Sequence, residues 1–103
     1  MVLYFSSTDE ILQALGQRLR VQRLAQGLPQ HELAKMAGLS LGALRKLEGS
    51  GQSSLETLVR AVRALGLADE LESLFALKRQ SIAQMEQAEA ATRRRRAPHR
   101  KRS

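Results

Sequence analysis

Apolar residues recur along most of the chain at the spacing of a helix that buries one face. The first such run predicts a helix over residues 9–25, and Gly27 follows it as a left-handed stop. Thr8 is the expected N-cap of this helix, with two acidic residues favourably placed in the first turn. The apolar positions of the run are Ile11, Leu12, Leu15 and Leu19.

Two short helices are predicted next. Proline favours the first helical turn, so the second helix starts at Pro29 and extends to Ala37, where Gly38 ends it. Ser40 is the expected cap of a third helix over residues 41–48, which stops at the glycines that follow.

A fourth helix is predicted to open with a capping box formed by Ser53 and Glu56, and to end at Gly66. A fifth begins near Asp69 and meets no breaker before Pro98, so we expect it to continue to about residue 91. Its cluster of Leu71, Leu74 and Phe75 either completes the core or serves dimerisation or a protein partner. Ile82 and Met85 lie beyond it, as a docking stripe or as a plain amphipathic extension.

Composition narrows the class of protein. A chain of 103 residues is the size of one domain. It has no cysteine, which excludes a disulfide scaffold, a zinc finger and a thiol nucleophile. Its three aromatic residues are too few for a sheet that stacks single-stranded bases. We expect an all-α fold with four parts: an N-terminal arm (1–8), a main helical domain (9–77), a helical extension (78–92) and a disordered basic tail (93–103).

The formal net charge of +7 is unevenly placed. Residues 93–103 hold seven cations and no acid, so the remainder is formally neutral. Within it, residues 11–65 have a net charge of +5 and residues 66–92 one of −3. The tail either follows DNA phosphates or a minor groove, or binds any polyanion. The strand-like residues 2–5 either pair with a partner or fray.

The window from Gln30 to Gly49 meets the demands of two short helices that pack at a steep angle across a three-residue turn. A small residue is needed where the helices cross, a glycine in the turn, and an apolar plug after it. An ordinary bundle also needs inward apolar residues, but Ala34, Gly38 and Leu39 at this spacing favour a helix-turn-helix. The residues expected to face inward or form the turn are Leu33, Ala34, Ala37, Gly38, Leu39, Leu44 and Leu47.

Residues 15–66 resemble the Cro/phage-repressor (Xre) type of helix-turn-helix family. The segments that carry the likeness are LGQRLRVQRLAQGL, QHELAKMAGLS, LRKLEG and SLETLVRAVRALGL. The resemblance implies a five-helix, lambda-repressor-like domain that binds double-stranded operator DNA as a homodimer. The last segment is most similar to HipB-like regulators, the antitoxins of HipA-kinase toxin systems, which implies a HipA-like kinase as a further partner.

The resemblance also implies the DNA-contacting residues. Gln30, at the start of the first motif helix, matches a residue that contacts phosphate, although the preceding position is Pro29 and offers no side-chain cap. A solvated surface amide is the alternative. The candidates of the second motif helix are Ser40, Leu41, Gly42, Arg45 and Lys46.

Leu41 and Gly42 occupy the usual base-reading positions and carry no hydrogen-bonding side chain, so direct readout is expected to be sparse. Specificity is then expected to depend on Arg45 and Lys46, on DNA shape and on dimer spacing. The alternative for Arg45 and Lys46 is a solvated charged face. Arg23 and Glu48 match a pair that bridges the first and third helices in phage repressors, a structural role. Arg18 and Arg20 either contact the backbone of DNA or lie on a solvated face.

Enzyme chemistry is not expected. His31 and His99 stand without a carboxylate cluster, phosphate loop or metal spacing, so no catalytic, cofactor or metal site is predicted. The start MVLYF has no basic n-region, and no apolar run spans a bilayer, so we expect a cytoplasmic, nucleoid-associated bacterial protein. The predicted function is autoregulatory repression of a toxin–antitoxin operon. The alternative is a protein-interaction module that binds a toxin or accessory protein, with DNA contact secondary.

Overall fold

The computed structural model describes residues 6–77 and 86–93, and all of their regular structure is helical. The helices are α1 (Thr8–Ala25), α2 (Gln30–Ala37), α3 (Leu41–Ser50), α4 (Leu55–Ala64) and α5 (Asp69–Glu72), and residues 86–93 are helical as well. The all-α prediction is therefore confirmed for this part of the chain. The predictions for the strand-like residues 2–5, for Ile82 and Met85 and for most of the basic tail lie outside the described residues.

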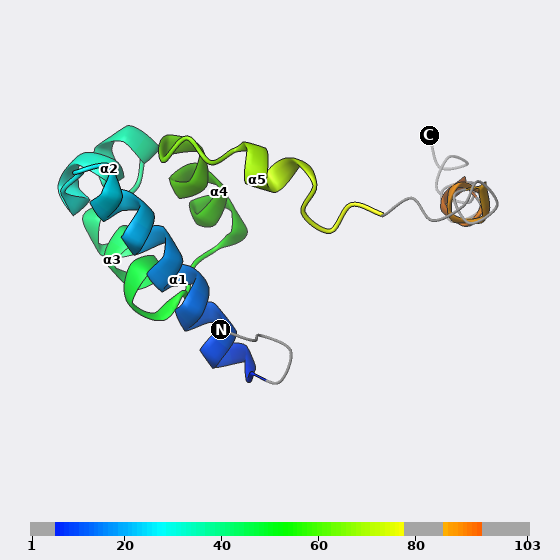
Figure 1. Cartoon of the computed structure of the whole chain (residues 1–103), viewed down its shortest axis with the longest axis horizontal. Coiled ribbons are helices and arrows are strands. Elements are labelled where there is room, and N and C mark those ends of the chain that lie inside the picture. The colour runs from blue at the N-terminus through cyan, green and yellow to red at the C-terminus, as the bar shows by residue number, and fades with distance from the viewer. Residues whose placement is uncertain (1–5, 78–85, 94–103) are drawn as a thin grey trace, which may run out of the picture.

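The core lies where α1 packs against α3, and α2 packs against both α3 and α4 (Figure 1). Leu33, Leu44 and Leu47 are its most deeply buried large side chains. Leu33 comes from α2, and Leu44 and Leu47 come from α3. The two helices of the predicted helix-turn-helix therefore also contribute the centre of the core. The other members of the buried cluster are Leu19, Ala34, Ala61, Val62 and Leu65.

The N-terminus of α1 is capped one residue earlier than predicted. Ser7, not Thr8, is the N-cap: its hydroxyl accepts from the Glu10 amide at 3.2 Å, and the Glu10 carboxylate accepts from the Ser7 amide at 2.9 Å. This reciprocal capping box needs an acidic residue three positions after the cap, which Ser7 has and Thr8 lacks. The backbone amide of Ser7, which donates to the Glu10 carboxylate, and secondly the Ser7 side chain lower the pKa of Glu10 below its ordinary value.

The capping box of Ser53 and Glu56 predicted for α4 is wrong. Ser54 caps the helix through its hydroxyl, which accepts from the Thr57 amide at 3.0 Å. Glu56 instead forms an ion pair with Arg60 one turn later, at 2.7 Å. The Glu56 carboxylate therefore pairs with Arg60 on the exposed face of α4 and does not cap the start of the helix.

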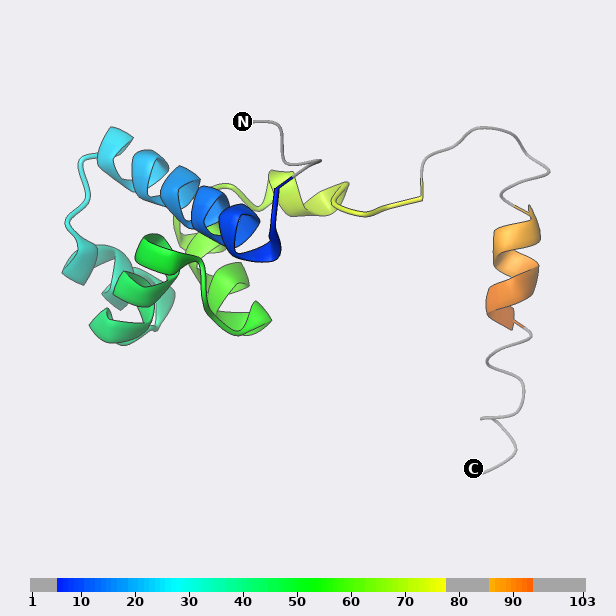
Figure 2. The ribbon, with the colours of Figure 1, turned by 90° about the horizontal axis from the view of Figure 1, so that it is seen from below.

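The long fifth helix predicted from Asp69 to about residue 91 is wrong. α5 ends at Glu72, and Phe75 has a φ of 60°, which a continuous helix does not permit. Leu71 packs against the core, but Leu74 and Phe75 lie exposed, so the next turn has no apolar surface to cover it. The helices α1 to α4 form a four-helix body. Both views show the chain leaving this four-helix body after α5 (Figures 1 and 2).

α1 and α3 approach each other closely, which was not predicted from the sequence. A Cβ on Gly16, in the middle of α1, would overlap the Leu47 carbonyl oxygen of α3. Gly51, just after α3, is equally crowded by the backbone of Leu12. Because these two residues have no side chain, the backbones of α1 and α3 are in direct contact, and this contact fixes the position of α3 relative to α1.

Candidate nucleic-acid interface

The turn between α2 and α3 sets the direction of α3. Gly38 adopts a left-handed conformation with a φ of 69°, which favours glycine. The Leu39 amide then donates to the Ala34 carbonyl at 2.9 Å, which closes the end of α2, and the Leu39 side chain packs against the core. Ala34 and Ala37 are buried, as expected for the small residues of this motif. The turn residues thus take the places that a helix-turn-helix demands.

α3 has one buried face and one exposed face. Leu44 and Leu47 fix the inner face in the core, while Arg45 and Lys46 are exposed on the outer one. Neither cation forms an ion pair with another described residue. Ser40 caps the helix, since its hydroxyl accepts from the Ala43 amide at 3.0 Å. The outer face therefore presents two unneutralised positive charges on a rigidly held helix.

The positions at which base readout was expected to be sparse lie near the start of this face. Leu41 is half-buried and Gly42 is exposed. A Cβ on Gly42 would meet no atom within 4 Å, so packing does not require a glycine there. Nothing within the fold explains this residue.

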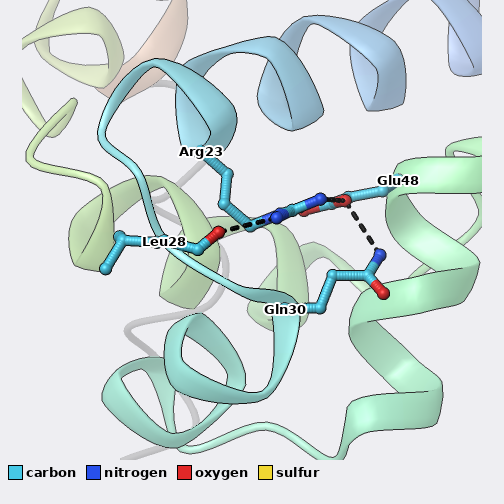
Figure 3. Close-up of polar contacts among 4 residues, drawn as sticks. All are labelled: Arg23, Leu28, Gln30 and Glu48. Carbon is cyan, nitrogen blue, oxygen red and sulfur yellow. Dashed lines mark hydrogen bonds and ion pairs between the residues drawn. The ribbon is translucent and has the colours of Figure 1, made fainter.

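A buried ion pair ties α3 to α1. The Arg23 Nε donates to Glu48 Oε2 at 2.8 Å and Nη2 donates to Oε1 at 3.0 Å, a two-point contact (Figure 3). Arg23 is 5% exposed and Glu48 2%, and Arg23 Nη1 also donates to the Leu28 carbonyl at 2.7 Å. No side-chain polar atom buried within the described residues lacks a partner. The pair expected between the first and third helices is present, and it is fully satisfied.

Gln30 is hydrogen-bonded to the same ion pair, a contact that its sequence position did not predict. Its Nε2 donates to Glu48 Oε1 at 3.0 Å, and the residue is half-buried (Figure 3). Pro29 supplies no side-chain cap to α2, as expected, so the backbone amides at the start of this helix have no side-chain acceptor. Glu48 thereby positions the side chain of Gln30, which is a candidate phosphate contact, from the helix that carries Arg45 and Lys46.

Over residues 6–77 and 86–93, no three metal-ligating side chains gather into a cluster. None of the helices in these ranges has the length and apolar character that crossing a membrane requires. Arg18 and Arg20 are exposed on α1, which leaves both interpretations of them open.

Comparison with known proteins agrees with this geometry. A family model described as a helix-turn-helix domain matches residues 14–75, more than half of the chain. The chain belongs to this helix-turn-helix family. The match supports the Xre-like type that the motif segments resemble, and it spans α2, the turn and α3. A search of curated proteins finds no match.

Membership in this family indicates DNA binding. In a helix-turn-helix, the second helix enters the major groove and the first crosses the DNA backbone. In this chain those helices are α3, with Arg45 and Lys46 outward, and α2, with Gln30 at its start.

Proposed function

We propose that this protein is a sequence-specific transcriptional repressor that binds operator DNA as a homodimer through α3. The contacting residues are Gln30, Ser40, Leu41, Gly42, Arg45 and Lys46. The observation that carries the proposal is the outer face of α3, where two exposed cations stand on a helix fixed by a buried ion pair. A rigid, positively charged helix is what insertion into the major groove requires.

The proposed contacts divide into two kinds. Gln30 and the free amides at the start of α2 contact phosphate and set the register of the protein on the duplex. Arg45 and Lys46 reach base edges or flanking phosphates, while Leu41 meets a thymine methyl. Because base contacts are few, DNA shape supplies part of the specificity.

Footprinting on the DNA upstream of the gene tests this proposal. The wild-type protein is expected to protect two half-sites about one helical turn apart, since a dimer presents two copies of α3. The double variant Arg45→Ala/Lys46→Ala is expected to lose this footprint. Lys35→Ala is the matched control, because it removes an exposed cation from α2 and leaves α3 intact. An unchanged footprint in the double variant would contradict the proposal.

The finer proposal is that the protein is the HipB-like component of a toxin–antitoxin operon and represses that operon. It rests on the resemblance of residues 54–67 to that branch alone. The test is co-purification of the full chain with the product of the adjacent gene. A kinase that binds the chain and increases repression supports the proposal. A neighbour that is not a kinase, or that does not bind, rejects this placement and leaves the repressor proposal standing.

A further inference from the structure

A shallow groove lies between α2 and α4, away from the network that anchors α3. Its apolar part is formed by Met36, Leu55 and Val59, and two arginines of α4, Arg60 and Arg63, border it. Met36 is 54% exposed and Leu55 76% exposed, which is unusual for large apolar side chains that lie together. Arg63 forms no ion pair with a described residue. Glu56 also lines the groove and forms an ion pair with Arg60 at 2.7 Å. The groove is therefore apolar inside, and Arg63 is the cation at its border that has no acidic partner among the described residues.

The segment Asp69–Leu77 has the opposite character. Its first four residues carry the acids Asp69, Glu70 and Glu72, none of which pairs with a cation in the described part of the chain. Leu74, Phe75 and Leu77 follow and are 49%, 93% and 71% exposed. An acidic turn followed by unburied apolar side chains matches the groove in both charge and polarity.

The segment does not fill the groove of its own chain. Leu71 packs against the core and fixes the start of the segment to its own domain, whereas Phe75 lies almost wholly in solvent and does not line the groove. The views in Figures 1 and 2 show the segment projecting from the four-helix body. A segment that projects is placed to reach another molecule.

We propose that the Asp69–Leu77 segment of one copy docks in the α2–α4 groove of a second copy, and the reverse, to form a two-fold dimer. Phe75 is the anchor in the apolar part, and the acids meet Arg63 at the border, since Arg60 is already paired with Glu56. Such an exchange is self-complementary, because each copy supplies one segment and one groove. The inference rests on the proposed function only in that it specifies the interface of the dimer proposed there.

Two variants of the full chain test the two halves of this contact. Phe75→Asp removes the anchor, and Arg63→Glu reverses the charge beside the groove. Sedimentation equilibrium without DNA is expected to show a wild-type dimer whose dissociation constant rises at least about tenfold in either variant. Val21→Asp and Arg20→Glu are the matched controls, because both residues are exposed on α1, outside groove and segment, and are expected to leave the dimer intact. Thermal unfolding by circular dichroism confirms that each variant is folded.

Mixing the two variants distinguishes this interface from one in which the segments pair with each other. A mixture holds one intact groove from Phe75→Asp and one intact segment from Arg63→Glu, so it is expected to form heterodimers more tightly than either variant self-associates. If Arg63→Glu leaves the dimer unchanged while Phe75→Asp dissociates it, the segments pair directly and the groove proposal is overturned. A wild-type chain that stays monomeric overturns it as well.

DNA binding is measured separately on a single half-site, which one copy can occupy. Variants that dissociate but bind the half-site like wild type support both proposals. A dimer that forms as described while no DNA binds overturns the proposed function and leaves this interface standing.

Discussion

In α3, Leu44 and Leu47 are 1% and 2% exposed, whereas Leu74 and Phe75 after α5 are 49% and 93% exposed. Both regions place apolar residues at helical spacing, yet only the first continues as a helix. The difference lies in what covers them: α3 is enclosed by α1, α2 and α4, while the segment after α5 projects beyond them. Spacing predicts a helix, but burial decides whether it forms.

The largest expected effect comes from removing the anchor of α3. Glu48→Ala leaves the Arg23 guanidinium buried without its carboxylate and is expected to lower the free energy of unfolding by about 3–5 kcal/mol. Urea unfolding followed by circular dichroism measures this change. Glu56→Ala is the matched control: it breaks the exposed pair with Arg60 and is expected to cost less than about 0.5 kcal/mol. Equal losses would mean that the buried pair does not hold α3.

The close contact between α1 and α3 is the next target. Gly16→Ala is expected to lower the free energy of unfolding by about 1–3 kcal/mol, because its methyl group overlaps the Leu47 carbonyl. The same unfolding experiment applies. Gly49→Ala serves as control, since it adds a methyl group to a helix where no atom lies within 4 Å. If Gly16→Ala is as stable as wild type, the backbone contact does not fix α3.

Helix propensity is expected to change the free energy of unfolding less than the buried contacts do. Gly42→Ala adds a methyl group to open space within α3 and is expected to raise the free energy of unfolding by about 1 kcal/mol. Thermal and urea unfolding measure the gain. A loss of stability would show that the packing around residue 42 leaves no room for the added methyl group.

The smallest effect is local and depends on pH. Since the folded-state pKa of Glu10 lies below its ordinary value of 4.5, its charge stabilises the start of α1 above that pH. The stabilisation is lost as the pH falls through the lowered pKa. Amide hydrogen exchange in the first turn of α1 is expected to speed up over this range, beyond its intrinsic pH dependence. Glu10→Gln, which stays neutral, should show no such step; the same step in this variant would assign it to another group.

The sequence predicted best what depends on local chemistry. α2 and α3 begin and end within about two residues of their predicted bounds, because Gly38, Ser40 and Gly51 act on their own neighbours. The caps of α1 and α4 were each one residue out, since adjacent hydroxyl residues compete for the same amides. The prediction of a long fifth helix was wrong because the spacing of apolar residues does not show whether other helices cover the apolar face.

In the candidate site, the pairing of Arg23 with Glu48 was predicted from the resemblance and is present. The bond from Gln30 to Glu48 and the crowding at Gly16 were not predicted. Both depend on how the backbones of separate helices approach, and neither a glutamine nor a glycine signals such a partner in sequence. The DNA-contacting roles of Gln30, Ser40, Leu41, Gly42, Arg45 and Lys46 stay predictions.

The ratio of affinities for upstream DNA and for scrambled DNA tests the central claim most directly. It is measured by gel shift for the full chain, for Arg45→Ala/Lys46→Ala and for a chain truncated after residue 92. We predict that the α3 variant loses the ratio. Among charged residues, the truncation removes only the cations of the tail. It is therefore expected to weaken binding to both DNAs alike and to flatten the salt dependence of the affinity, while the ratio of the two affinities stays unchanged. A ratio that survives the α3 variant and disappears with the tail would contradict the account.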